Sequence, residues 1–496
     1  MNDNIELTSV RSNYKKFKRK AEYERIHFYL PGNNVIVVFR ITGNLKLDAL
    51  RRTIERMRYR HPMIRSHIEF DETDSSWFVD HETPPSPLNV VPRIDENTWL
   101  IEVLKEYWNP FDICLGPLIR FFFIQGSNES ELIAFAQHSI CDGLSLVYLL
   151  RDMLLDISHP REINRTIENL PTIKEGYKLD SIKLNPIYTK INNKINKLWQ
   201  SKQVKLTQAD FYPLHKVLQT FKINAIQWTL DEATTLSLIK KSRAEGVSMN
   251  SVLYCAILNV QHLLQNDKED FRKKITMPIN LRKYLNIPIG EEVGNFAGGE
   301  KFEIKINWKH DFWKQVKAVH KKLQKRITPQ SMFSVVKLMD QLDPTLIDAR
   351  NMLYVGNLST PPLDKYNQIL KNFEYVRFLK KMKKNILKNP IQIGTILTNL
   401  GNISIPEDYD QIQLKQIMFL PPSIPYIEKF IGTVTFKNRL QGTIIFMEKF
   451  LNPEIATQFG HDLEVYLQRT IQLDENISSN RDIVPNTYIV ETTEGV

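Results

Sequence analysis

The stretch Glu131-Leu-Ile-Ala-Phe-Ala-Gln-His-Ser-Ile-Cys-Asp-Gly-Leu-Ser-Leu-Val-Tyr-Leu-Leu-Arg-Asp152 contains three patterns in succession. Residues 132–136 form an apolar run typical of a buried strand, and a polar cluster at 137–143 ends that run. Apolar residues then recur at helical spacing from Leu144 onward. The stretch therefore predicts a strand, a short loop and a helix, with His138 held at the end of the strand.

A histidine at the end of a strand suits general-base catalysis. Neutral imidazole, with an ordinary pKa of about 6.5, accepts a proton from a hydroxyl or an amine at neutral pH. On position alone, His138 is more simply interpreted as a structural histidine bonded to the backbone, because position rarely marks catalysis. The residues around it therefore decide between the two interpretations.

Residues 138–143, His-Ser-Ile-Cys-Asp-Gly, resemble the His-x-x-x-Asp-Gly motif of the chloramphenicol-acetyltransferase-like superfamily. That superfamily includes alcohol O-acyltransferases, wax-ester and polyketide-ester synthases, and the condensation domains of nonribosomal peptide synthetases. Three more stretches are similar to its other elements, in the same order: Tyr59–Arg65, Asn109–Arg120, and Met277–Arg282 followed by Gly294–Phe296. With the strand pattern around them, the resemblance covers residues from about 25 to 450.

Two departures from the superfamily's patterns distinguish this chain. Condensation domains usually carry two successive histidines, whereas Gln137 precedes His138 here. The Asp-Phe-Gly-Trp-Gly stretch of plant-type acyltransferases is missing, and Thr398–Asn402 stands in an equivalent place. Both departures favour a stand-alone ester- or amide-forming enzyme over a synthetase module.

The alternation of strand and helix patterns along the chain indicates an α/β fold. The resemblance adds two chloramphenicol-acetyltransferase-like lobes arranged in a V, with an active-site tunnel between them. We expect an N-terminal lobe at 1–180, a crossover linker at 181–225 with one helix near 184–204, a C-terminal lobe at 226–473 ending in a helix from 453, and a polar tail at 474–496. Residues 353–360 predict a strand and a turn.

The resemblance implies acyl transfer from a thioester, carried by coenzyme A or by an acyl carrier protein, to an alcohol or an amine. His138 would deprotonate the acceptor. The superfamily's motif aspartate pairs with an arginine, so Asp142 is expected to be structural, with Arg65 as its first candidate partner and Arg282 as its second. A buried carboxylate requires such a partner.

The tetrahedral oxyanion of acyl transfer requires hydrogen-bond donors in a site that excludes water. Asn295, Asn399 or a backbone N–H group are the candidates, and Gly143 allows close approach of the backbone because it has no Cβ. Cys141 or Ser139 forming an acyl-enzyme is an alternative, although neither has a base of its own nearby apart from His138. We expect no cofactor and no metal, since thioester acyl transfer requires neither.

The net charge of +10 and the pI of about 9.1 favour anionic partners such as coenzyme A, a phosphopantetheine carrier or anionic lipid. The Lys380–Lys388 region follows several aromatic residues, so peripheral membrane contact is one interpretation and a solvated face is the other. No nucleic-acid motif is present. Three scattered cysteines and the lack of a signal peptide indicate a cytoplasmic protein, and we expect a monomer.

Three other functions stay open at this stage. The first is a condensation enzyme of the nonribosomal-peptide type, and the second is a non-catalytic carrier-binding homologue that keeps the fold. The third is a basic membrane- or nucleic-acid-associated protein in which the His-x-x-x-Asp-Gly match is a coincidence; its binding to phosphate polymers would depend steeply on salt.

Overall fold

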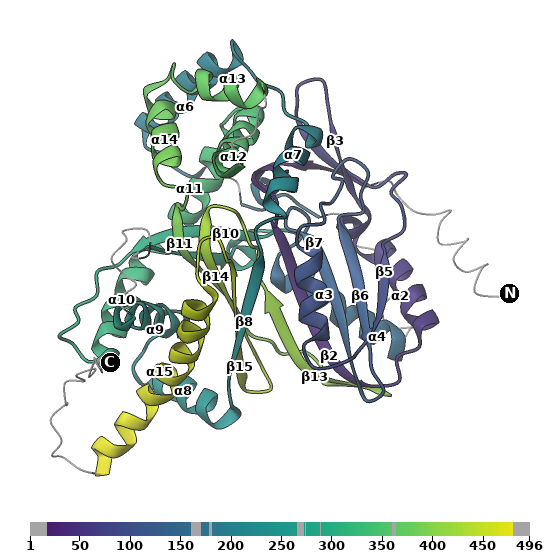
Figure 1. Ribbon diagram of the computed structural model, residues 1–496, viewed down its shortest axis with the longest axis vertical. Helices are drawn as coiled ribbons and strands as arrows, with labels where there is room; N and C mark the ends of the chain where they lie inside the picture. Colours follow the sequence, from purple (N-terminus) through teal and green to yellow (C-terminus); the bar gives the residue numbers. More distant parts are fainter. Residues whose placement is uncertain are drawn as a thin grey trace, which may run out of the picture.

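The computed structural model describes residues 17–159, 170–177, 181–264, 272, 274–287, 289–359 and 364–479. Two six-stranded sheets form its frame, with a small third sheet and a group of helices beside them (Figure 1). The expected α/β fold is confirmed. No helix among the described residues is long and apolar enough to cross a lipid bilayer.

The first sheet is built mainly from the N-terminal part of the chain. Its strands lie in the order β12 (Asp408–Tyr409), β13 (Ile412–Leu420), β2 (Asn34–Gly43), β7 (Glu129–Gln137), β6 (Ile119–Gln125) and β5 (Leu88–Pro92). The central strand β7 is buried along nearly its whole length, as expected for an apolar run with both faces covered. Helix α4 (Gly143–Ser158) packs on β2 and β7.

Helix α2 (Leu47–Arg60) packs against α4, and its buried residues Leu50, Ile54 and Met57 lie on a single face because they are spaced three and four residues apart. Hydrogen bonds to the carboxylate of Asp152 connect the end of α2 to α4. Asp152 of α4 accepts from Arg60 Nε at 2.7 Å and lies 3.3 Å from His61 Nε2. The Tyr59–Arg65 stretch, which ends in a 3₁₀ helix at Pro62–Arg65, therefore joins the two helices.

The second sheet lies beside the first, and β13 contacts two of its strands. Its order is β10 (Ala297–Glu303), β9 (Lys274–Asn280), β11 (Ile393–Asn402), β14 (Ile427–Phe436), β15 (Arg439–Met447) and β8 (Ile223–Leu230). Four helices accompany this sheet: α8 (Glu232–Ala244), α9 (Met249–Leu263), α10 (Phe312–Arg326) and α15 (Pro453–Ser479). Helix α15 lies along β8 and α9, as Figure 1 shows in yellow.

Two helices from the expected linker join a group of helices drawn at the top of Figure 1. They are α6 (Pro186–Gln200) and α7 (Gln208–Leu218). The others are α11 (Pro329–Asp340), α12 (Pro344–Ser359), α13 (Asp364–Asn372) and α14 (Arg377–Lys388). Trp199 Nε1 donates to Thr345 Oγ1 at 2.8 Å, which ties α6 to α12. The expected crossover is thus packed into a layer of helices.

The third sheet is a three-stranded antiparallel ribbon of the N-terminal part. Its order is β1 (Lys18–Ala21), β4 (Ser76–Val79) and β3 (His67–Phe70). The remaining short elements are α3 (Thr98–Glu106), α5 (Ile173–Gly176) and 3₁₀ helices at Tyr23–His27 and Arg282–Tyr284. The first of these 3₁₀ helices contacts α12.

Three expectations differ from the structure. Residues 353–359 belong to helix α12 instead of a strand and turn, because their apolar side chains pack against neighbouring helices. Strands β12 and β13 lie within the range assigned to the C-terminal lobe, yet they extend the first sheet. Helix α15 runs on to Ser479, beyond the expected start of the tail, and the rest of the tail lies outside the described residues.

Candidate active site

The His138 loop, defined here as residues 138–142, connects the end of β7 to the start of α4. Gln137 is the last residue of β7, and the His138 backbone N–H donates to Asn33 O at 3.1 Å. Asp142 is the N-cap of α4, where its side chain accepts from Ser145 N at 3.0 Å. This is the usual role of aspartate at a helix start, so local hydrogen bonding fixes the loop at both ends.

The orientation of His138 follows from one hydrogen bond. Its Nδ1 lies 2.8 Å from the carbonyl oxygen of Cys141. Because a carbonyl oxygen only accepts, Nδ1 carries the proton, and the lone pair of a neutral ring lies on Nε2. Burial lowers the pKa of His138, and the Cys141 carbonyl and the Asp142 charge oppose that shift only in part. The ring is therefore neutral at neutral pH, as a general base must be.

Asp142 lies at the centre of a network that holds the loop. Arg282 Nη1 donates to Asp142 Oδ2 at 2.7 Å, and Phe296 N donates to the same oxygen at 3.0 Å. Burial alone would raise the pKa of Asp142, but Arg282 and the backbone donors outweigh it and hold that pKa below its ordinary value. The carboxylate is thus a fixed anion bound on several sides.

Arg65 is not the partner of Asp142, contrary to the first expectation. Its Nε donates to Asp80 Oδ2 at 3.1 Å, and Nη1 donates to Tyr59 O at 3.0 Å. This buried pair lies beside the small third sheet, since Asp80 directly follows β4. The second candidate, Arg282, is the arginine that the tertiary structure brings to Asp142.

Asn295 is a candidate oxyanion donor, but its side chain is bonded within the His138 loop region, through one amide N–H group and the amide oxygen. Its Nδ2 donates to the backbone carbonyl of His138 at 2.8 Å, and its Oδ1 accepts from Ala297 N at 3.1 Å. Next to it, the backbone carbonyl of Gly294 accepts from Ser145 Oγ at 2.7 Å. This segment positions the His138 loop and does not line the cavity described next.

A cavity of about 280 Å³ lies between the two large sheets, with His138 in its wall. The first sheet and its loop contribute Val35, His138, Gly143 and Phe419, and the second sheet contributes residues of β9, β10 and β11. Most of the lining is apolar. Such a site, with a few convergent polar groups, fits a small-molecule substrate.

Asn399 and Gly143 both line this cavity. The amide of Asn399 is engaged: Nδ2 donates to Asn250 Oδ1 at 2.7 Å, and Oδ1 accepts from Gly401 N at 2.8 Å. Gly143 is the first residue of α4, and a Cβ built there would lie 2.7 Å from Leu400 Cδ2. The backbone of α4 therefore meets the cavity wall closely.

Sequence reasoning missed His27, which lines the same cavity. Its ring lies against that of His138, with centroids 4.3 Å apart and an interplanar angle of 38°. Asn33 Nδ2 lies 2.9 Å from His27 Nδ1; because the amide nitrogen donates, Nδ1 accepts and Nε2 carries the proton. Burial, with a smaller contribution from His138, holds the pKa of His27 well below its ordinary value. No local pattern marks this residue, because its role depends on a contact across 111 positions of chain.

The acyl-enzyme alternative finds little support in the loop. Cys141 is buried, and burial followed by the nearby Asp142 charge raises the pKa of its thiol well above the ordinary value. A raised pKa removes the thiolate, which is the nucleophilic form. Ser139 is also fully buried, with no hydrogen-bond partner for its hydroxyl among the described residues. Neither side chain lines the cavity.

Comparison with known proteins gives matches to part of the sequence and to nearly the whole fold. Residues 220–362 match the family described as phthiocerol/phthiodiolone dimycocerosyl transferase C-terminus. A segment of 139 residues, 27% of this chain, is 30% identical to the nonribosomal peptide synthetase agiA of Aspergillus flavus. The match covers 2% of that synthetase, so the chain spans a small part of such relatives.

Two solved structures cover most of the chain. Polyketide synthase associated protein 5 from Mycobacterium tuberculosis superposes with a TM-score of 0.58 at 13% identity, covering 92% of this chain and 98% of the other. Trichothecene 15-O-acetyltransferase from Fusarium sporotrichioides superposes with a TM-score of 0.57 at 15% identity. The superposition covers 92% of this chain and 96% of the acetyltransferase. At these identities the likeness establishes the fold. The chain therefore shares the two-lobed fold of these solved acyltransferase and condensation-domain structures.

Proposed function

We propose that the protein is a stand-alone acyltransferase that transfers an acyl group from a thioester to an alcohol or an amine. The observation that carries this proposal is the bond from His138 Nδ1 to the Cys141 carbonyl, in a histidine that lines the cavity. That bond leaves Nε2 as the basic nitrogen. A base of this kind contributes about 10²- to 10⁴-fold to the rate.

In the proposed reaction, Nε2 of His138 takes the proton of the acceptor as its oxygen or nitrogen attacks the thioester carbonyl. The tetrahedral intermediate then collapses, the carbon–sulfur bond breaks, and the thiolate leaves with the proton from His138. Asp142 stays ionised and bound to Arg282 throughout, so it holds the loop and does not exchange protons with the imidazole.

The developing oxyanion requires donors at the cavity wall. Gly143 and Leu144 line the cavity and occupy the first turn of α4, whose backbone N–H groups have no partner within a helix. The positive end of the helix dipole lies at the same place. Asn295 does not line the cavity, and Asn399 donates one of its two amide N–H groups to Asn250, so the backbone groups of α4 are the first candidates and the second N–H of Asn399 is the next.

A condensation-type reaction with a carrier-bound donor is the second candidate. The partial match to a nonribosomal peptide synthetase favours it. The same His138 geometry serves both reactions, because both deprotonate a nucleophile beside a thioester. The net charge of +10 is compatible with coenzyme A and with a phosphopantetheine carrier.

The test is release of free thiol from acyl-coenzyme A of several chain lengths, with a pool of alcohols and amines. Wild type is compared with His138→Ala and with His461→Ala, a matched control that removes an exposed histidine on α15. We expect acceptor-dependent release in wild type and in the His461 variant, and its loss in the His138 variant.

Release only from an acylated carrier protein would select the condensation-type reaction. Absence of release from both kinds of donor would overturn the proposal and leave the non-catalytic carrier-binding function. Undiminished release by His138→Ala would refute the assignment of the base.

A further inference from the structure

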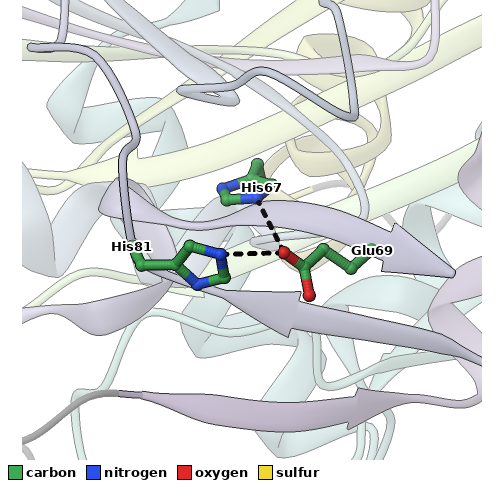
Figure 2. A group of neighbouring side chains, drawn as sticks. All are labelled: His67, Glu69 and His81. Atoms are coloured by element: carbon green, nitrogen blue, oxygen red, sulfur yellow. Dashed lines mark ion pairs between the residues drawn. The ribbon is translucent and has the colours of Figure 1, made fainter. Parts of the chain in front are cut away.

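A second group of chemically active side chains lies on the small third sheet. His67 and Glu69 belong to β3, and His81 follows β4 (Figure 2). One nitrogen of each histidine and one oxygen of the glutamate all lie within 4.8 Å of one another. Figure 2 shows the two imidazoles directed at the same carboxylate oxygen. None of the three residues lines the cavity that contains His138.

Strand register explains why these residues meet. His67 and Glu69 are two positions apart on β3, so their side chains leave the same face of the ribbon. The register pairs His67 with Val79 and Glu69 with Trp77. His81 lies two positions beyond Val79 and thus continues that face. The pairing of β3 with β4 thus returns the segment after Val79 to the side of His67, and His81 lies on that segment.

The distances suit a small divalent metal ion. Glu69 Oε1 lies 2.9 Å from His81 Nε2 and 3.7 Å from His67 Nε2. Ligands about 2.0–2.1 Å from a tetrahedral Zn²⁺ are about 3.3 Å apart, a value between these two distances. Two histidines and one glutamate are a known zinc ligand set, which leaves one position for water.

The orientation of His67 also suits a metal ligand. Its Nδ1 lies 2.9 Å from Thr83 Oγ1, so the hydroxyl can hold the ring with Nε2 toward Glu69. Metal-bound histidines commonly donate their second ring N–H to a hydrogen-bond acceptor, and a hydroxyl oxygen can accept such a bond. The His67 side chain is buried, whereas those of Glu69 and His81 are 42% and 43% exposed. The group therefore has one anchored ligand and an open side for entry of an ion and water.

We propose that His67, Glu69 and His81 bind one Zn²⁺ ion, with water in the fourth position, and that the ion clamps β3 to the segment following β4. The site is independent of the proposed acyl transfer, because it shares no residue with the cavity. The alternative is that Glu69 simply forms ion pairs with the two histidines. The two arrangements differ in a measurable way, since only the first gives saturable binding of one metal ion.

The test is titration of the protein with Zn²⁺ by calorimetry, after treatment with a chelator. Wild type should bind one equivalent, and Co²⁺ should give the visible absorption of a tetrahedral site. His81→Ala should lose this binding. Thr83→Val should keep the stoichiometry and weaken the affinity by about 10- to 100-fold, as expected when a supporting hydrogen bond is removed.

His461→Ala and His138→Ala serve as controls and should bind Zn²⁺ like wild type, whatever their acyltransferase activity. His81 is partly exposed, so its replacement should leave the fold intact, which a melting curve without metal verifies. Absence of a saturable site in wild type would overturn the proposal. Unchanged affinity in His81→Ala would do so as well.

Discussion

At the scale of single residues, His138 combines burial with a fixed tautomer. Its basic form must be neutral to accept a proton, and burial lowers its pKa below the ordinary value of 6.5. We therefore expect kcat/KM to keep its plateau at pH 6.5 and to decline only as the pH falls through the lowered pKa. A pH–rate profile measures this; an acid limb centred above 6.5 would contradict the orientation and burial described for the ring.

His27 presents a second test in the same cavity. His27→Phe keeps an aromatic ring against His138 and removes the Nε2–H group assigned from the Asn33 contact. If that group helps to hold the acceptor, KM for the acceptor should rise while kcat changes less. Steady-state kinetics with varied acceptor separates the two constants. Unchanged KM would mean that His27 only fills space.

Asp142 should contribute to stability as well as to activity. Asp142→Asn removes the negative charge that pairs with Arg282. Both side chains are less than 10% exposed, so the arginine is left with an uncompensated buried charge. Breaking a buried ion pair from one side costs about 3–5 kcal/mol, because the remaining charge is uncompensated. We expect a lower melting temperature together with reduced turnover, measured by calorimetry and thiol release.

The pair Arg65–Asp80 offers the matched control for that experiment, since it is equally buried and lies away from the cavity. Asp80→Asn should lower the melting temperature without a specific loss of turnover in the protein that remains folded. An Asp142→Asn enzyme with full rate and unchanged melting would refute the structural role of Asp142.

At the scale of elements, the start of α4 meets strands β11 and β13 across the cavity. A Cβ at Gly143 would lie 2.7 Å from Leu400 Cδ2 and 2.9 Å from Phe419 Cε2. Gly143→Ala should therefore push these side chains aside and change the shape of the cavity. We expect kcat/KM to fall about tenfold or more for the longest accepted acyl chain, which corresponds to about 1.4 kcal/mol, and less for the shortest.

Gly299→Ala is the control for this change. Gly299 of β10 lines the same cavity, but a Cβ there would meet only Thr276 Cγ2 at 3.9 Å, an ordinary contact. The dependence of kcat/KM on acyl chain length should stay close to that of wild type. If kcat/KM depends on acyl chain length in the same way in wild type and in Gly143→Ala, the start of α4 does not limit the length of the acyl chain.

At the scale of the whole molecule, the positive charge is gathered in part on helix α14. Leu379 and Ile386 are buried, while Lys381, Lys384 and Lys388 are exposed and Phe378 is 55% exposed. A basic helix with exposed aromatic surface binds anionic lipid. We expect the protein to sediment weakly with anionic vesicles, and less so at high salt. A variant in which the charges of the three lysines are reversed should not sediment with the vesicles.

The control variant reverses the charge of three exposed lysines elsewhere, Lys305, Lys309 and Lys321, which lie on α10 and the segment before it. It changes the net charge by the same amount on another surface. If both triple variants lose binding to the same degree, net charge alone explains it. If wild type does not sediment with vesicles, the membrane hypothesis is wrong and α14 is a solvated face.

Much of the fold could be predicted from sequence because its signals are local. The apolar run of β7, the turn after it and the apolar stripe of α4 lie within about twenty residues. Helix α12 was missed at 353–359, where packing against several neighbouring helices outweighs a short pattern that resembled a strand. The crossing of β13 into the first sheet also left no local trace, because strand pairing joins positions hundreds of residues apart.

The sequence by itself determined the strand–loop–helix around His138, since hydrogen bonds within a few residues specify it. Only the tertiary structure decided that Arg282 pairs with Asp142 and that His27 lies against His138. The same holds for the group His67, Glu69 and His81, which comes together only when β3 and β4 pair and the segment after β4 lies beside them. The physical reason is distance along the chain: short-range geometry is encoded by neighbouring residues, whereas these contacts exist only after the sheets have packed.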